Sequence, residues 1–342
     1  MNTEVFLRNT ALLLTAWCFL FPSVASAGAK YRLKVAVQAP ERSLWGRTLR
    51  DISREVKEET NGEVQLKVYA GGVHGDERTV LRKIRVGQLH GGVFMSDGVV
   101  TICPDSLALS LPFLFQDEDE LTYALEGVSP ELEQLARQKG YEILAWPRLG
   151  FSYLFSQEEI RTIDALRGSK PWLIENNPIG RHFFGALRVT PVSTGVPNVL
   201  PALQSGLIRT VFTPPLGLVA MQWHTRVKYR LNLRITFSIG LFALQKKALK
   251  RLPEAHQETL RAVFKRNNLN LTNKLRKENN AALEVLQKHG IETVTVDPET
   301  RQELERTTEE VGKRMARKEF SAAIFEKVKG RIREYREGAP RK

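Results

Sequence analysis

Few residues in this 342-residue sequence have the types and spacing that catalysis or metal binding requires. His182, His224, His256 and His289 stand apart from the acidic or cysteine neighbours of a metal site. There is no Gly-x-Ser-x-Gly elbow, phosphate-binding glycine loop or His-Glu-x-x-His pair. The sequence therefore predicts no enzyme, no metal site and no cofactor, and any chemistry must be that of binding.

The first 27 residues have the three zones of a secretory signal, which predicts export to the periplasm. Arg8 supplies positive charge, 11–21 is almost wholly apolar, and 25–27 reads Ala-Ser-Ala, a small-x-small cleavage site. The apolar run is shorter than the ~20 residues of a spanning helix. Cleavage is favoured over a membrane anchor or lipidation at Cys18, and it leaves Cys103 as the only cysteine, so no internal disulfide can form.

The chain is basic, with 51 Lys and Arg against 38 Asp and Glu and a net charge of +13. Such a charge attracts nucleic acid, anionic membrane or acidic partners. Export argues against nucleic acid. Basic residues also alternate with Glu over 301–342, which is typical of a solvated helix face. An ordinary surface is the favoured interpretation, and attraction to anionic lipid headgroups is the alternative.

The elements that must position a binding site follow an α/β pattern. Alternating and helical apolar spacing predicts strands at 32–38, 64–68, 91–95, 141–146, 149–155, 169–174, 188–192 and 291–296. It predicts helices at 44–57, 80–87, 118–139, 181–187 and 253–289, and from 298 onward. Strands that alternate with helices favour mostly parallel sheets with covered faces.

The mature chain of about 315 residues exceeds what one core usually serves, so we expect two lobes. Lobe I is expected over 28–150 plus about 236–262, and lobe II over 151–235 plus about 263–342. No low-complexity linker separates them, so crossing strands should join them and allow hinge closure over a ligand. The helix at 253–289 is long enough to span both lobes.

Several motifs in order along the chain resemble the solute-binding proteins of TRAP transporters, of the C4-dicarboxylate-binding type. They are Thr60–Tyr69, Gly71–Glu77, Gly87–Leu89, Leu111–Phe115, Ala202–Gly206 and Leu252–Pro253. The resemblance covers nearly the whole mature chain. It implies two α/β lobes around a deep cleft and delivery of a captured small molecule to integral membrane subunits of a transporter.

The chain departs from that family at four positions where the resemblance places polar contacts to the ligand. Trp172 stands where the family has the arginine that pairs with a ligand carboxylate, a geometry that guanidinium supplies. A second arginine that follows a Gly-Phe pair is replaced by Ser152. Met95 replaces an acidic or polar contact, and Thr213 replaces an asparagine before proline. A carboxylate buried there would lack its charged partner.

We therefore expect a rebuilt pocket for a hydrophobic or neutral ligand, a class that includes lipid-like molecules. The residues expected to line it are Trp172, Phe94, Met95, Phe212, Ser152 and Thr213, with Trp146 and Trp223 at the rim and His74 beside the cleft. The alternative keeps an organic-acid ligand with a relocated anchor, Arg148 or Lys170. Each of Trp146, Trp223 and His74 could also be an ordinary core or turn residue.

The pattern resembles a branch of TRAP binding proteins that lack the arginine and work with a periplasmic helical-repeat partner protein. Two other roles stay open at this point. The closed protein could present a surface to a sensor of the envelope, or it could carry lipids by means of its basic surface.

Overall fold

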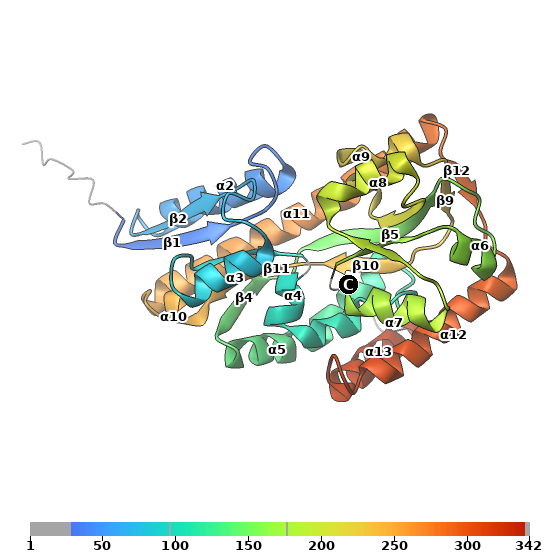
Figure 1. Cartoon of the computed structure of the whole chain (residues 1–342). Helices are drawn as coiled ribbons and strands as arrows, with labels where there is room; N and C mark the ends of the chain where they lie inside the picture. Colours follow the sequence, from blue (N-terminus) through green and yellow to red (C-terminus); the bar gives the residue numbers. More distant parts are fainter. Residues whose placement is uncertain (1–28, 96, 176, 339–342) are drawn as a thin grey trace, which may run out of the picture.

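The computed structural model describes residues 29–95, 97–175 and 177–338. They form two α/β lobes, each built on a sheet, lying side by side along the molecule (Figure 1). The expected signal peptide at 1–27 lies outside the described residues. Within the described ranges, no helix is both long enough and apolar enough to cross a membrane.

Lobe I has a five-stranded sheet in the order β2-β1-β3-β11-β4. Its strands are β1 (Tyr31–Ala36), β2 (Val64–Tyr69), β3 (Gly91–Phe94), β4 (Tyr141–Ala145) and β11 (Leu241–Gln245). Its helices are α2 (Leu44–Glu59), α3 (Glu77–Arg85), α4 (Asp97–Ile102), η1 (Pro104–Leu109), α5 (Glu118–Gln138) and α10 (Lys246–Leu249). The sheet is buried on both sides: Leu33 and Val35 face the core beneath α2, and Val80 and Ile84 of α3 pack on the other side.

Lobe II has a second sheet in the order β10-β5-β9-β12, with β8 also paired to β5, and a small β6-β7 sheet. The strands are β5 (Arg148–Ser156), β6 (Trp172–Ile174), β7 (Val192–Thr194), β8 (Thr210–Thr213), β9 (Tyr229–Leu231), β10 (Thr236–Ile239) and β12 (Glu292–Val294). The helices are α6 (Ile163–Gly168), α7 (Pro178–Ala186), η2 (Val196–Asn198), α8 (Val199–Ser205), α9 (Pro215–Ala220) and η3 (Trp223–Arg226).

The prediction of mostly parallel sheets is wrong, because the strands that connect the lobes run antiparallel to their neighbours. β4 continues into β5 through Trp146 and Pro147, and β10 continues into β11 through Gly240. One connection enters lobe II and the other returns, so β11 pairs antiparallel with β3 and β4, and β10 pairs antiparallel with β5. The two crossings are tied where the Gly240 N–H donates to the Pro147 carbonyl oxygen at 2.9 Å.

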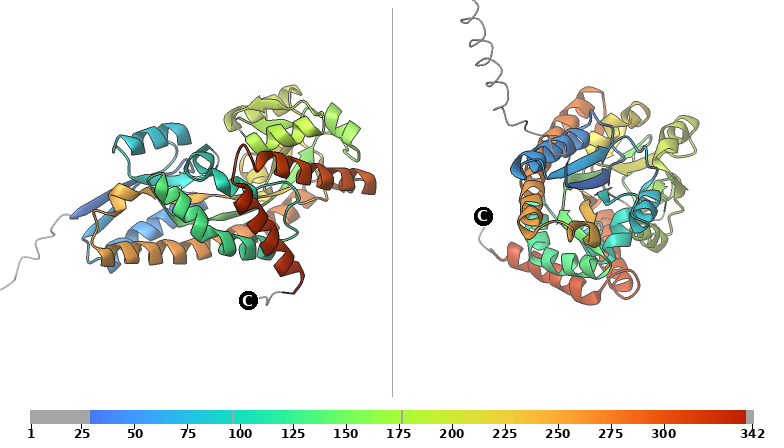
Figure 2. Two further views of the ribbon diagram at one scale, coloured as in Figure 1. Left: turned by 90° about the horizontal axis from the view of Figure 1, so that it is seen from below. Right: turned by 90° about the vertical axis from the view of Figure 1, so that its left-hand side faces the viewer.

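The C-terminal helices are shared between the lobes. α11 (Glu254–Lys288) runs the length of the molecule, with Leu260 to Leu275 in the lobe I core and Leu286 in the lobe II core. α12 (Pro298–Met315) begins against lobe II, whereas α13 (Ala322–Arg336) packs against α5 (Figure 2). The expectation placed all of 263–342 in lobe II, but the packing of α13 attaches the last helix to lobe I.

The expected strand at 188–192 is displaced toward the C-terminus. Arg188 adopts a positive φ of 55° where α7 ends, and extended pairing starts only at Val192, opposite Trp172. Apolar alternation alone could not show this turn, because the short β7 is defined by its partner strand.

We predict that His90 makes the stability of lobe I depend on pH. Its Nδ1 accepts the Lys34 backbone N–H at 2.9 Å, which requires an unprotonated nitrogen there. Burial, together with the charges of Lys34 and Arg251, lowers the pKa of His90. In the unfolded chain, the His90 imidazole takes up a proton near the ordinary histidine pKa of about 6.5, whereas in the folded protein it is protonated only at lower pH. Stability is therefore fully present above about pH 6.5 and falls as the pH drops through the folded pKa.

Urea unfolding at pH 7.5 and 5.5 measures this effect. His90→Asn retains an acceptor oxygen without a titrating group, so its loss of stability between the two pH values should be smaller than that of the wild type. Equal losses in the two proteins would contradict the assignment.

Candidate functional site

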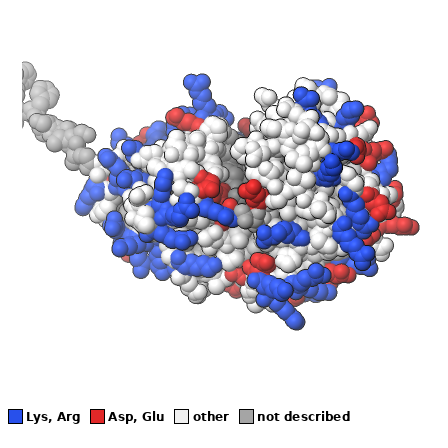
Figure 3. Space-filling view, in the orientation of Figure 1, with Lys and Arg blue, Asp and Glu red and all other residues white. Residues whose placement is uncertain are grey.

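A cavity of about 300 Å³ lies between the lobes, and the space-filling surface is hollowed there (Figure 3). Lobe I contributes the stretch from Met95, directly after β3, through η1, and lobe II contributes β6, α7 and β8. The crossing strands β5 and β10 form part of the wall. Six of the nine predicted site residues line this cavity: Met95, Ser152, Trp172, Phe212, Thr213 and Trp223.

Trp172 begins β6 and is held in one orientation. Its Nε1–H donates to the Thr194 carbonyl oxygen at 2.9 Å across the β6-β7 pair. The indole lies 5.9 Å from the Phe212 ring and 5.3 Å from Trp223 in an edge-on contact. Only 5% of Trp172 is exposed, so it serves both the core of lobe II and the cavity wall.

The crossing strands supply hydroxyl groups that are already satisfied inside the protein. Ser152 Oγ lies 3.3 Å from Ser238 Oγ, because β5 and β10 pair antiparallel at this point. Thr236 Oγ1 donates to the Ser110 carbonyl oxygen at 2.7 Å. These groups offer a ligand weak hydrogen bonding and no charge.

The loop that carries Met95 is fixed by a buried carboxylate. Glu77 on α3 accepts the Met95 backbone N–H at 2.8 Å and the Gly98 N–H at 2.7 Å. Glu77 is 5% exposed, so both bonds are shielded from water. The start of α4 is therefore held against α3, and Met95 is presented at the cleft.

The cavity wall carries no positive charge among the residues that the structure describes. Its charged members are Asp97 and Glu175, and Asp97 is paired with Arg78 at 3.2 Å. The rest of the wall is predominantly aliphatic and aromatic. A ligand carboxylate would meet no guanidinium or ammonium there.

The two alternative anchors lie elsewhere. Arg148 lies 3.6 Å from Glu118 and donates to Thr122 Oγ1 at 3.0 Å, so it is engaged with α5. Burial lowers the pKa of Arg148. Lys170 is exposed in the turn before β6, with a positive φ of 46°. Neither residue lines the cavity.

Three predicted site residues are not brought to the cavity. Phe94 is fully buried in the lobe I core. Trp146 donates from Nε1 to Glu133 at 3.2 Å, beside α5. His74 packs edge-on against Tyr69 at 4.5 Å and lies against a small separate cavity within lobe I. Trp146 and His74 have the core and turn roles that were their alternatives, whereas the prediction that Phe94 lines the cavity is wrong, because its ring points into the lobe I core.

Sequence reasoning missed several apolar residues that line the cavity. Phe113, Phe183 and Phe237 lie on it, as does Met221, which is 38% exposed. Phe113 belongs to a motif that had been used only for the family resemblance. The adjacent Phe183 and Phe184 of α7 were an available signal in the sequence, because both of them line the cavity.

Reactive groups are scarce in the described part of the chain. Burial raises the pKa of the Cys103 thiol to about 12, so it stays protonated at neutral pH and is a poor nucleophile. Within the described ranges, no three His, Cys, Asp or Glu side chains gather as a metal ion would require.

The family is decided by a match over 35–319 to the model described as bacterial extracellular solute-binding protein, family 7. The chain belongs to this family. The family is one of extracellular solute-binding proteins, a class of transport proteins and not of enzymes. A solute-binding protein of Verminephrobacter eiseniae is 24% identical over 237 residues, which are 68% of this chain and 70% of the relative.

Solved structures of TRAP periplasmic solute-binding proteins share the two-lobed fold. One from Ochrobactrum anthropi has a TM-score of 0.82 at 19% identity, and the match covers 91% of this chain and 97% of the Ochrobactrum chain. That protein has its C-terminus bound in the ligand-binding pocket. One from Desulfovibrio salexigens, with bound orotic acid, has a TM-score of 0.80 at 19% identity, and the match covers 90% of this chain and 100% of the Desulfovibrio chain.

We predict that Trp172 is required for stability as well as for the cavity. Trp172→Ala should lower the free energy of unfolding by about 3–5 kcal/mol, since it removes a buried ring and a hydrogen bond. Met221→Ala, at a partly exposed position of the same cavity, should cost less than about 1 kcal/mol. Urea unfolding of both variants measures the contrast. A Trp172→Ala protein as stable as Met221→Ala would contradict this role.

Proposed function

We propose that this TRAP-type binding protein captures a hydrophobic or neutral, lipid-like solute in the interlobe cavity and delivers it to the membrane subunits of a transporter. The observation that carries the proposal is the apolar wall, whose described residues include no Arg, Lys or His. Moving an ionised carboxylate into such a site without a charged partner costs several kcal/mol, whereas an apolar solute gains by leaving water.

An organic acid is the second candidate, because related folds bind such ligands. The similar structures include one from Xanthobacter autotrophicus with bound β-D-galacturonate and one from Haemophilus influenzae with bound L-gulonate. An organic acid in this chain would need a charged anchor, and the two basic candidates are engaged or exposed away from the cavity. The cavity chemistry therefore favours the uncharged solute.

The proposal includes location and partners. Cleavage at Ala25-Ser26-Ala27 would release the mature protein into the periplasm. There it would meet the membrane subunits directly or through a helical-repeat protein that shields an apolar solute from water.

We predict that the purified protein retains an apolar molecule and does not bind simple acids. Native mass spectrometry should detect a co-purified compound. Calorimetry with C4-dicarboxylates, sialic acid, galacturonate and orotate should show no micromolar affinity, because the cavity offers no basic partner. Micromolar binding of any of these acids by the wild type would contradict the proposal.

A variant pair makes this test sharper. Met221→Arg adds a guanidinium at a partly exposed cavity position and should create measurable affinity for at least one acid. It should also weaken binding of N-phenyl-1-naphthylamine, a neutral fluorescent probe. Leu269→Arg adds the same charge at an exposed position of α11 outside the cavity and should change neither.

We predict that the lobes close by bending at the two crossings. Small-angle scattering should show a smaller radius of gyration once the ligand found by mass spectrometry is restored to the stripped protein. Gly240→Val should reduce that change, because a Cβ at Gly240 would lie 2.8 Å from the Phe94 carbonyl oxygen and force the crossing apart. An unchanged radius at saturation in the wild type would contradict closure.

A further inference from the structure

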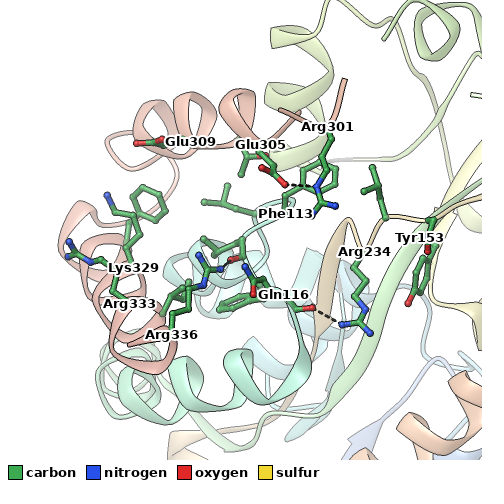
Figure 4. A pocket seen from close by; sticks show the side chains of 18 of the residues that line it. Phe113, Gln116, Tyr153, Arg234, Arg301, Glu305, Glu309, Lys329, Arg333 and Arg336 are labelled. Carbon is green, nitrogen blue, oxygen red and sulfur yellow. Dashed lines mark hydrogen bonds and ion pairs between the residues drawn. The ribbon is translucent and has the colours of Figure 1, made fainter. Parts of the chain in front are cut away.

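A second, larger groove of about 1000 Å³ lies on the other side of Phe113 and Leu233, which line both it and the interlobe cavity. It is bounded by α12, α13, the segment 111–116 and the stretch from β9 to β10 (Figure 4). Six basic residues and three acidic residues are among those that line it. The basic residues are Arg230, Arg234, Arg301, Lys329, Arg333 and Arg336.

Two of these arginines have contacts only with neutral groups within the described part of the chain. Arg230 stacks on the Tyr153 ring at 5.1 Å and donates to Thr293 Oγ1 at 3.1 Å. Arg234 stacks on the Phe151 ring at 5.3 Å and donates to the Gln116 carbonyl oxygen at 2.7 Å. Both guanidinium groups are oriented by these contacts, yet their charges are not neutralised by a carboxylate.

Most other charges of the groove are already paired. Arg301 pairs with Glu305 at 3.0 Å, Lys329 with Glu326 at 2.7 Å, and Arg336 with the buried Glu120 at 2.6 Å. The remaining lining acid, Glu309, pairs with Lys313 at 2.6 Å. Near Arg234, Arg276 pairs with Glu118 and Asp119 at the start of α5, and Asp117 accepts the Glu120 backbone N–H. Arg333 has no ion pair among the described residues either, so the excess positive charge of the groove resides on Arg230, Arg234 and Arg333. Of these three, Arg230 and Arg234 are the ones held by stacking on aromatic rings.

The two arginines are also neighbours. Phe151 and Tyr153 are two residues apart on β5, so their side chains project from the same face of the strand. The guanidinium groups that stack on these rings therefore lie on the same face of the sheet, and both line the groove. In Figure 4, Arg234 lies beside Tyr153 and bonds to Gln116, Arg301 approaches from α12, and Arg336 lies across the groove on α13.

We propose that this groove is a second binding site, separate from the solute cavity, for a phosphate-bearing ligand held by Arg230 and Arg234. Guanidinium groups form charge-assisted, bidentate bonds to phosphate oxygens, and stacking on aromatic rings orients their planes before binding. The groove is larger than a bare ion requires, which suits an organic phosphate or the headgroup of an anionic lipid.

Calorimetry with glycerol 3-phosphate in low salt, and flotation with phosphatidylglycerol vesicles, distinguish the two sources of phosphate. Arg230→Gln/Arg234→Gln should weaken binding of the effective probe about tenfold or more, because two charged hydrogen-bond donors are lost. Lys247→Gln/Lys250→Gln removes the same charge from exposed positions in and directly after α10 and should stay within about twofold of the wild type. Phosphatidylcholine vesicles are the neutral lipid control.

Binding of glycerol 3-phosphate would identify a free organic phosphate, and binding to phosphatidylglycerol vesicles alone would identify a lipid headgroup. No saturable binding of either probe by the wild type would overturn the proposal, as would an equal loss in the α10 control. Arg234→Lys keeps the charge but not the planar guanidinium, so it should give an intermediate affinity. This milder variant tests the proposal even if the double variant misfolds.

The same variants separate this site from the solute cavity. Affinity of the Arg230→Gln/Arg234→Gln protein for N-phenyl-1-naphthylamine should stay within about twofold of the wild type, since neither arginine lines the cavity. Loss of that affinity in a folded double variant would show that the two sites are not separate and would overturn the proposal. Failure of the wild type to bind the neutral probe would instead count against the apolar solute.

Discussion

The paired crossing of β4–β5 and β10–β11 is the constraint on which the rest of the molecule depends. The bond from Gly240 to Pro147 closes this crossing, and the Phe94 carbonyl oxygen lies so near Gly240 that a side chain there would meet it. The same strands complete both sheets and bring Ser152 and Ser238 to the cavity. The connection between the lobes and the wall of the site are therefore one structure, and bending at the crossing must change the shape of the cavity.

The chemistry of the cavity follows from where charge has been placed around that crossing. Arg148 begins β5, one of the crossing strands, but its side chain is bound to α5, whereas Ser152 further along the strand faces the cavity. Trp172 in the cavity wall is anchored by its own hydrogen bond to Thr194. An indole that is oriented and buried in this way adds apolar surface to the wall without adding charge.

Ion pairing explains why a strongly basic chain need not be basic everywhere. Along α11, α12 and α13 many Lys and Arg residues are paired with Glu or Asp, in agreement with the alternating charges of the sequence. Exposed pairs of this kind contribute little stability, but they cancel local charge. The arginines that stack on Tyr153 and Phe151 are different, because their positions are held by neutral partners and their charge remains available.

The sequence by itself determined the α/β class, the two lobes, the family and the long helix, because these depend on local periodicity and on motifs that are contiguous in the chain. The helix expected at 253–289 is present at Glu254–Lys288. The sequence also indicated Trp172, Met95 and Phe212, which line the cavity. It could not distinguish them from Phe94 and Trp146, which do not line it. Only the tertiary structure decided the antiparallel crossings, the attachment of α13 to lobe I and the residues that face the cavity. Each of these depends on pairing between segments far apart in sequence, and a single-residue difference in strand register exchanges a core-facing side chain for a cavity-facing one.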